Sequence, residues 1–434
     1  MRPRFFHRFI HHLALPVATF ALAGAVSATT ITVRPDSEGP AVRPSVMAGY
    51  NFGNWMPVSE FRESLREIPP GALRFPAGNA GDESNLDGAV LGTFAAGLTL
   101  MPGTPELMVQ TRVFQGRDGR PAANSPEDAA AAVKLARERG LNVTYWEIGN
   151  EPDLYGPVRG DTSWTPERYC DVFRAQAAAV RREQPGAKIA GPAVSGAVPA
   201  AMRFLEAFVT RCGDVVDVLT WHIYPTEGDG SDAAALSTVR EADRTMAHAR
   251  AVWADPKRNP LGHGRAIGFG VTEYGLSWRT ERPRFLSDQT GALWAMETTL
   301  RLAKGGAEVA HYFAYLATGF HGLLDNGGGP RPTFYAFRLL SDLKGRFVDT
   351  ASDDTGLWAH AVRDGDTLKL VLINSHATRQ TVKVDAGAFA ARGARWFDAA
   401  IAEKEAEYGT LPAGSQLVLP ARSATIVTLT RPAP

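Results

Sequence analysis

The strongest constraint on the fold is an alternation of short apolar or β-branched runs with longer amphipathic runs between residues 46 and 343. The short runs have the length of strands, and the longer ones carry the period of helices. Eight strand segments are predicted, at 46–51, 72–76, 107–113, 143–149, 188–192, 217–223, 266–272 and 308–315. Eight such alternations over about 250–300 residues predict an α/β fold, a (β/α)8 TIM barrel. An open doubly wound sheet is the alternative, but no Gly-x-Gly-x-x-Gly follows the first strand.

Helix starts are marked most clearly at Ser125-Pro and Thr165-Pro, where an N-cap residue precedes a proline at the first helical position. Residues 77–106 are rich in Gly, Ala, Asn and Asp, and they predict a long loop in place of a regular helix. The predicted helices cover 125–140, 165–184, 199–211, 232–254, 287–304 and 333–343.

The helical period disappears after Gly345, where strand alternation broken by turn residues takes over. This C-terminal region predicts a small all-β sandwich domain. The isolated Thr30-Ile-Thr-Val run is a further strand that could pair into it. We therefore expect a barrel over 46–343 and a β-sandwich built from 29–45 plus 344–434.

The N-terminus has the pattern of a secretory signal peptide. Arg2, Arg4 and Arg8 form a cationic region, and the apolar run at 13–26 is short for a bilayer span. We expect residues 1–28 to be removed and the rest to be periplasmic or extracellular, with no membrane contact after cleavage. An uncleaved membrane anchor is the alternative.

The cysteine content leaves one question open. Export permits a disulfide between Cys170 and Cys212, but spacing cannot show proximity, and two buried free thiols are the favoured alternative. Neither cysteine has a zinc-ligand spacing, and His248 has no histidine partner on its predicted helix. The sequence therefore predicts no metal and no cofactor.

Charge argues against polyanionic partners. Lys+Arg and Asp+Glu both number 46, so the net charge is zero, and no basic run with interleaved aromatic residues occurs. We expect no nucleic acid partner. The oligomeric state is not indicated by the sequence.

Two glutamates follow separate predicted strands where a barrel places its active site, at the carboxyl ends of the strands. Glu151 follows the fourth strand in Trp-Glu-Ile-Gly-Asn-Glu-Pro, and Pro152 favours an extended backbone at Glu151. Glu273 ends the seventh strand in Val-Thr-Glu-Tyr-Gly. Glycosidic cleavage needs one carboxylic acid to protonate the leaving oxygen and one carboxylate to attack or to activate water. Taken singly, each glutamate would more often be a surface or salt-bridged residue.

Glu147 is a rival to Glu151 on the same strand. Four residues separate them, so their α-carbons lie about 13 Å apart. Glu147 also precedes the barrel mouth, and we expect it to be a buried, hydrogen-bonded structural carboxylate.

Trp146, the Asn150-Glu151-Pro152 element and the second glutamate on strand seven resemble clan A, the 4/7 superfamily of retaining glycoside hydrolases. Members include α-L-arabinofuranosidases, β-xylosidases and heparanase-like β-glucuronidases, several with an appended β-sandwich. The resemblance spans nearly the whole mature chain. It implies that Glu151 is the catalytic acid/base and Glu273 the nucleophile.

Further residues take roles from the same resemblance. Asn150 would hydrogen-bond the sugar hydroxyl next to the anomeric carbon, and Arg74 would keep the nucleophile ionised. Asn79 in Pro-Ala-Gly-Asn resembles the sugar-binding asparagine of the Pro-Gly-Gly-Asn element in arabinofuranosidases, although Ala77 replaces a glycine. His222 and Tyr224 in Trp-His-Ile-Tyr-Pro would position the nucleophile and the sugar. The nucleophile segment lacks the Glu-Trp-Asn of several relatives, which leaves the substrate open.

Aromatic side chains near the predicted rim complete the candidate carbohydrate site. Those predicted to bind substrate are Tyr274, Trp278 and Tyr312; Trp55, Trp164 and His321 are weaker candidates. We expect an exo-acting arabinofuranosidase or β-xylosidase-like enzyme, with a β-glucuronidase or an endo-acting exopolysaccharide hydrolase as alternatives. A non-catalytic carbohydrate-binding barrel is the alternative of another class.

Overall fold

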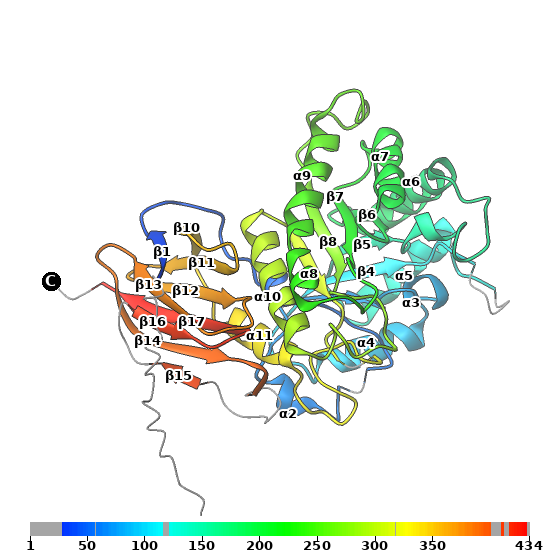
Figure 1. The fold of residues 1–434 in the computed structure, drawn as a ribbon. Coiled ribbons are helices and arrows are strands. Elements are labelled where there is room, and N and C mark those ends of the chain that lie inside the picture. The colour runs from blue at the N-terminus through cyan, green and yellow to red at the C-terminus, as the bar shows by residue number, and fades with distance from the viewer. Residues whose placement is uncertain are drawn as a thin grey trace, which may run out of the picture.

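The computed structural model describes residues 28–56, 58–115, 121–316, 318–400, 409–411 and 416–431. The predicted signal peptide lies outside the described residues, except for Ala28. Two bodies are visible in Figure 1, a closed barrel surrounded by helices and a β-rich body beside it, with α10 and α11 between them. No helix among the described residues has both the length and the apolar character needed to cross a bilayer.

The barrel consists of eight parallel strands in sequential order, closed by pairing of the first with the last. These are β2 (Gly49–Asn51), β3 (Ala72–Phe75), β4 (Glu106–Thr111), β5 (Val143–Ile148), β6 (Lys188–Val194), β7 (Val218–Ile223), β8 (Gly268–Tyr274) and β9 (Val309–Tyr312). Every predicted strand is present, and the predicted TIM barrel is confirmed. The first prediction began too early, because residues 44–47 form the short helix α1 (Pro44–Met47).

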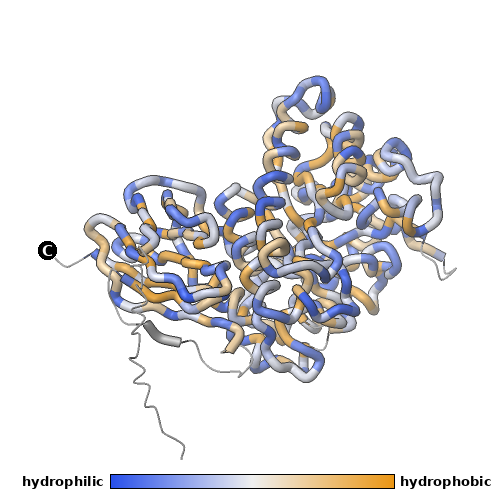
Figure 2. The backbone as a smooth tube through the Cα atoms, in the orientation of Figure 1, coloured by the Kyte–Doolittle hydropathy of each residue, from blue (hydrophilic) through white to orange (hydrophobic). Residues whose placement is uncertain are grey.

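Helices cover the barrel between its strands. The long ones are α5 (Pro126–Glu138), α6 (Pro166–Glu183), α7 (Pro199–Cys212), α9 (Arg240–Ala254), α10 (Gln289–Lys304) and α11 (Pro332–Leu340), and the short ones are α2 (Arg62–Leu65), α3 (Ala80–Glu83), α8 (Asp232–Ser237) and the 3₁₀ turn η1 (Pro152–Leu154). The α5 start carries a full capping box between Ser125 and Asp128. Apolar segments gather in the interior of both bodies, whereas the tip beyond α9 is polar (Figure 2).

The predicted loop at 77–106 is wrong, because α4 (Gly88–Leu98) forms within it. The Asp87 side chain accepts hydrogen bonds from the backbone N–H groups of Ala89 and Val90 and so caps this helix. Leu91 and Phe94 then bury one face, with Phe94 stacked on Phe75 of β3. Capping and this packing outweigh the low helix propensity of the glycines.

The β-rich body contains strands from both ends of the described chain. The strand β1 (Thr29–Arg34) lies between β10 (Arg346–Ser352) and β13 (Gln380–Asp385). The remaining strands are β11 (Leu357–Asp364), β12 (Thr367–Asn374), β14 (Ala390–Phe397), β15 (Gly409–Leu411), β16 (Gln416–Leu419) and β17 (Ser423–Thr430). The first half of β10 pairs with β11 and the second half with β1, so β10 links two sheet segments whose apolar faces enclose one core.

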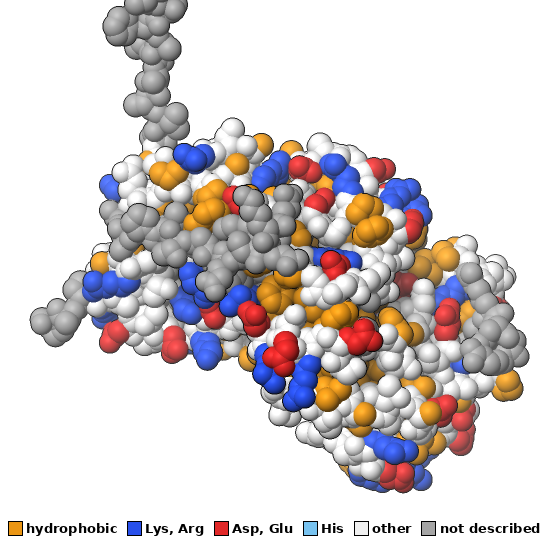
Figure 3. Space-filling view, turned by 90° about the horizontal axis from the view of Figure 1, so that it is seen from below, with side chains coloured by type: hydrophobic (Ala, Val, Ile, Leu, Met, Phe, Trp, Pro, Cys, Tyr) orange, Lys and Arg blue, Asp and Glu red, His pale blue; other side chains and the backbone are white. Residues whose placement is uncertain are grey.

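The two bodies pack through a continuous apolar interface. Core residues of the β-rich body, such as Phe397 and Ile426, belong to the same cluster as the barrel helices, and Tyr335 of α11 stacks on Phe397. Within this interface, Glu297 of α10 is fully buried and lies 2.9 Å from His360 Nε2 and 2.6 Å from Arg301 Nε. On the outside, acidic and basic side chains lie among one another on the face shown in Figure 3, as expected for a chain without net charge.

Cys170 of α6 and Cys212 of α7 form a disulfide, so the favoured alternative of two free thiols is wrong. Both side chains are buried where the two helices pack side by side. Sequence spacing could not reveal this proximity, because it arises from the packing of consecutive barrel helices.

Breaking this disulfide should lower the free energy of unfolding. The bond closes a segment of 42 residues, and the entropy of closing such a loop corresponds to about 4 kcal/mol at 25 °C. We expect urea unfolding of the Cys170→Ala/Cys212→Ala protein to show a loss of this order. Reduced wild-type protein is the matched comparison, and equal stability of oxidised and reduced protein would contradict the prediction.

Candidate active site

Glu151 and Glu273 converge at the carboxyl end of the barrel strands. Glu273 lies within β8, the seventh barrel strand, and Glu151 follows β5, the fourth, by three residues. Together with His222 of β7, each offers a ligand atom within 4.8 Å of the others. The structure therefore brings the two predicted catalytic residues into one site.

The backbone at Glu151 differs from the prediction. Its φ and ψ of 49° and 52° lie in the left-handed region, so the expected extended conformation is wrong. The Glu151 N–H donates to the Ala193 carbonyl of β6, and Pro152 then begins η1. A non-glycine residue in this region costs on the order of 1–3 kcal/mol. The surrounding contacts hold the glutamate there and turn its side chain toward the barrel mouth.

Arg74, at the end of β3, is the central cation of the site. It is fully buried and donates from Nε to Glu147 Oε2 at 2.5 Å and from Nη1 to Glu273 Oε1 at 2.7 Å. Its remaining bonds go to side-chain oxygens of Asn51 at 2.9 Å and Asn150 at 2.8 Å. The guanidinium of β3 thus holds one oxygen of the Glu273 carboxylate and links it to residues of β2 and β5.

Glu147 occupies the position expected of a structural carboxylate. It is fully buried below the mouth, between Arg74 and the Thr220 hydroxyl, which donates to Glu147 Oε1 at 3.0 Å. It has no exposed surface to offer a substrate, whereas Glu151 retains 14 % side-chain exposure.

His222 and Tyr224 surround the two glutamates. His222 Nδ1 lies 3.0 Å from Glu151 Oε1 and 3.8 Å from Glu273 Oε2. The Tyr224 hydroxyl donates to Glu273 Oε2 at 2.9 Å. Glu273 is therefore held at one oxygen by Arg74 and at the other by Tyr224, and His222 is nearer to Glu151 than to the nucleophile candidate.

The surroundings push the pKa values of the two glutamates apart. Burial raises the pKa of Glu151, and nearby Glu273 adds to this against the opposing effect of His222. Burial acts the same way on Glu273, but His222, Arg74 and Tyr224 together outweigh it and lower its pKa. For His222, burial lowers the pKa, yet the Glu273 and Glu151 charges prevail and raise it. Opposed shifts of this kind favour a proton on Glu151 and a charge on Glu273.

Asn150 and Asn79 extend the site to the rim. The Asn150 carbonyl oxygen accepts from Arg74, and its amide donates to Asn79 Oδ1 at 3.3 Å. Asn79 is exposed and also accepts a bond from Arg159. Asn150 directly precedes Glu151, and Asn79 is linked to Asn150 by the amide hydrogen bond; their predicted contacts with a sugar stay a prediction.

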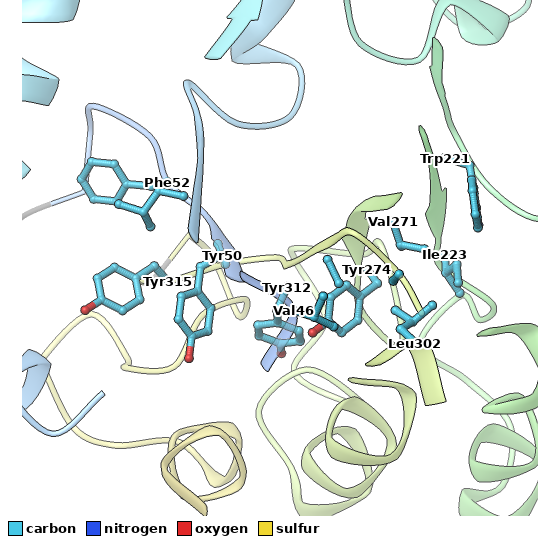
Figure 4. Packing of buried hydrophobic residues seen from close by; sticks show 14 of the residues in the cluster. Val46, Tyr50, Phe52, Trp221, Ile223, Val271, Tyr274, Leu302, Tyr312 and Tyr315 are labelled. Carbon is cyan, nitrogen blue, oxygen red and sulfur yellow. The ribbon is translucent and has the colours of Figure 1, made fainter. Parts of the chain in front are cut away.

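Tyr274 and Tyr312 do not reach the site, so their predicted role in substrate binding is wrong. Both are buried between the barrel and its helices, where the Tyr274 ring packs against Tyr312 and the Tyr312 ring packs against Phe337 of α11 (Figure 4). The Tyr274 hydroxyl bonds to Thr299 of α10 at 2.7 Å. Side chains alternate along a strand, so the residue after the inward-facing Glu273 must face outward.

Trp278 lies in the loop after β8 and is 46 % exposed. Its indole N–H donates to Glu227 at 3.0 Å, and the Arg279 guanidinium covers its ring with a centroid distance of 3.9 Å. Of the weaker aromatic candidates, Trp55 is exposed, whereas Trp164 and His321 are buried.

Several polar residues of the site were not predicted from the sequence. Asn51 ends the first barrel strand and contacts Arg74, and Gln110 Oε1 on β4 accepts from the Ala77 N–H at 2.9 Å. Asp153 accepts from Ser195 beside Glu151, and burial raises its pKa. Polar residues at strand ends were the available signal for Asn51 and Gln110. The position of Asp153 beside Glu151 depends on the turn η1, which was not predicted from the sequence.

Known proteins resemble about half of this chain in sequence. No family model matches the chain. A β-xylosidase from Caldicellulosiruptor saccharolyticus is 24% identical over 247 residues, which are 54% of this chain and 48% of that protein. A heparanase from Rattus norvegicus is 23% identical over 237 residues, 50% of this chain and 40% of that protein. The chain thus spans less than half the length of these curated relatives.

Solved structures share the fold over nearly the whole chain. An α-L-arabinofuranosidase from Thermotoga maritima aligns with a TM-score of 0.73 at 14% identity, covering 93% of this chain and 100% of that one. A Paenibacillus polymyxa xyloglucanase of glycoside hydrolase family 44 aligns at 0.67 and 14% identity, covering 93% and 99%. Arabinofuranosidase, β-xylosidase and heparanase are the kinds of protein that the sequence was expected to resemble, so the predicted resemblance is confirmed.

Proposed function

We propose that this protein is a retaining glycoside hydrolase in which Glu151 is the acid/base and Glu273 the nucleophile. The observation that carries the proposal is the pairing of two close carboxylates with opposed pKa shifts at one barrel mouth. Oxygens within 4.8 Å suit the separation of about 5–5.5 Å between carboxyl groups of retaining enzymes. Inverting enzymes need roughly 6.5–9.5 Å, to admit a water molecule.

The reaction would proceed in two displacements. In the first, a Glu273 oxygen attacks the anomeric carbon while the bond to the leaving oxygen breaks, and Glu151 gives that oxygen its proton. Forming the glycosyl ester removes the Glu273 charge, which had helped to raise the pKa of Glu151. Glu151 is then ionised and takes a proton from water, whose oxygen attacks the anomeric carbon and releases Glu273 as a carboxylate.

For the substrate, we favour exo-acting hydrolysis of an α-L-arabinofuranosyl or β-xylosyl end group. The relatives named arabinofuranosidase and β-xylosidase support this choice, as does Asn79 beside Asn150 at the rim. The heparanase similarity supports a β-glucuronidase as the second candidate, and the xyloglucanase neighbour supports endo-acting cleavage of a polysaccharide as the third.

Export to the periplasm or the outside of the cell remains part of the proposal. The Cys170–Cys212 disulfide supports it, because disulfides persist mainly in oxidising compartments. A non-catalytic carbohydrate-binding barrel is less well supported, since such a barrel has no need for a pair of carboxylates with opposed pKa shifts.

A panel of aryl glycosides tests the assignment. Purified protein is assayed with 4-nitrophenyl α-L-arabinofuranoside, β-xyloside and β-glucuronide, and proton NMR records the anomeric configuration of the first-formed product. We expect retention, and hydrolysis of the arabinofuranoside or xyloside. Undiminished hydrolysis of every substrate by both Glu151→Gln and Glu273→Gln proteins would refute the enzymatic assignment, and an inverted product would refute the mechanism.

The Tyr224→Phe substitution should reduce activity through the nucleophile. It removes the hydrogen bond to Glu273 Oε2, and bonds to charged groups contribute about 1.5–3 kcal/mol, equivalent to roughly 10–100-fold in kcat/KM. The pKa of Glu273 should rise, so the acidic limb of the pH profile moves to higher pH. An unchanged limb would contradict this role. Tyr315→Phe, which alters a buried tyrosine hydroxyl bonded to the Ile68 carbonyl, is the control.

A further inference from the structure

A cavity of about 630 Å³ lies where the barrel meets the β-rich body. Its barrel side is formed by α8, the start of α9 and Arg301 of α10. Its other side is formed by the turns before β11, after β12 and before β17. Sites for small ligands have volumes of roughly 300–1,000 Å³, so one or two sugar rings fit here.

The lining carries two arginines without a carboxylate partner among the described residues, Arg240 and Arg422. Arg301 pairs with Glu297 and Asp243, which lie outside the lining. Asp354 is the one carboxylate among the lining residues and lies 2.9 Å from His376 Nε2. The lining therefore carries more arginines than carboxylates, although the whole chain has no net charge.

Arg422 is held in place as a binding group would need to be. Its backbone lies in the left-handed region with φ of 46°, its N–H donates to the His376 carbonyl, and its carbonyl accepts from Gln289. One guanidinium nitrogen, Nη1, is enclosed by protein atoms and has no hydrogen-bond partner among the described residues, so another part of Arg422 is what lines the cavity. A buried guanidinium nitrogen without a partner is uncommon, because losing water without a replacement costs about 1–3 kcal/mol or more.

An aromatic ring and hydroxyl groups complete the lining. Trp358 of β11 contributes an indole ring, and Ser237, Ser352 and Ser375 contribute hydroxyl oxygens, each of which donates its own proton to a backbone carbonyl. An indole face packs against the C–H face of a sugar ring, and guanidinium groups bind carboxylates with paired hydrogen bonds. Together these groups match a sugar ring that carries a carboxylate.

We propose that this cavity binds a uronic acid residue of an acidic oligosaccharide. The helix α8, which begins at Asp232, is the next element after β7, which carries His222. The cavity shares no residue with the two glutamates and the histidine of the candidate active site. Binding here does not depend on the proposed hydrolytic function.

Calorimetry with trigalacturonic acid tests the proposal, with neutral xylotriose and inorganic phosphate as comparison ligands. The titrated protein is Glu151→Gln/Glu273→Gln, so that no turnover occurs. We expect it to bind trigalacturonic acid more tightly than either comparison ligand. Adding Arg240→Gln and Arg422→Gln should weaken that binding at least about 10-fold, since both lost contacts are charged.

Arg34→Gln/Arg346→Gln, which removes two exposed arginines of β1 and β10 outside the cavity, is the control of equal charge and should bind normally. Unweakened binding by the Arg240→Gln/Arg422→Gln protein would overturn the proposal. So would the absence of trigalacturonic acid binding, or equal binding of phosphate, which would indicate an anion site only. In the otherwise native chain, the Arg240→Gln/Arg422→Gln protein should hydrolyse aryl glycosides like wild type, which separates this test from that of the proposed function.

Discussion

Glu273→Ala should lower kcat by roughly 10⁴–10⁶-fold, in the range seen when an enzyme loses its nucleophile. The methyl group cannot attack the anomeric carbon, and no other described carboxylate can take the place of Glu273, because Glu147 is buried behind Arg74. Substitution by alanine also leaves space beside Arg74 and Tyr224, where an added small anion can bind. The measurement is hydrolysis of the best aryl glycoside from the panel.

Azide should restore turnover of this variant and give a glycosyl azide of inverted configuration, because azide then attacks from the face vacated by the carboxylate. Glu281→Ala is the matched control, since Glu281 is an exposed glutamate on the loop that follows β8. It should retain wild-type activity. A Glu273→Ala protein that keeps more than about a tenth of the wild-type rate would show that Glu273 is not the nucleophile.

The barrel could be predicted from the sequence because each of its elements carries a local signal. Buried parallel strands appear as continuous apolar runs, and the Ser125-Pro and Thr165-Pro starts mark helices by their caps. The helix α4 was not predicted, because its composition favours a loop whereas its tertiary packing favours a helix. Its glycines favour a loop, and the stacking of Phe94 on Phe75, which stabilises the helix, joins residues distant in sequence.

The residues of the candidate site could be predicted where they lie at the ends of barrel strands. Glu151, Glu273, Arg74, His222 and Tyr224 all lie at strand ends, and a barrel brings strand ends together. Tyr274 and Tyr312 are predicted to bind substrate because they lie near the predicted rim, but both side chains face away from the barrel mouth. The left-handed turn at Glu151 could not be predicted, since the proline rule favours the opposite conformation.

The contacts of Arg74 explain why one cation serves both stability and chemistry. It neutralises the buried carboxylates of Glu147 and Glu273 and holds the amide oxygens of Asn51 and Asn150. Without it, two carboxylates would be buried close together with no fixed countercharge, a situation that proteins avoid. The same contact helps to keep the pKa of Glu273 low.

Arg74→Met should therefore lower the free energy of unfolding by roughly 3–5 kcal/mol, the cost of leaving a buried charge without its partner. Loss of the guanidinium raises the pKa of Glu273, because burial then dominates. In the wild type the lowered pKa of Glu273 stabilises the fold above its unfolded pKa, and this contribution is lost as the pH falls through the folded value. The deficit of the variant should consequently be largest near neutral pH and shrink in acid, where a protonated Glu273 needs no countercharge.

Urea unfolding from pH 4 to pH 8 measures this deficit, and a deficit that is constant with pH would contradict the electrostatic explanation. Adding Glu147→Gln to Arg74→Met removes one of the two uncompensated carboxylates and should recover part of the stability. Activity should remain at least about 10³-fold below wild type in both variants, since neither restores the charge that keeps Glu273 ionised. Recovered stability without recovered activity would separate the two roles of Arg74. Its contact with Glu147 neutralises a buried carboxylate and so stabilises the fold, whereas its contact with Glu273 keeps the nucleophile ionised.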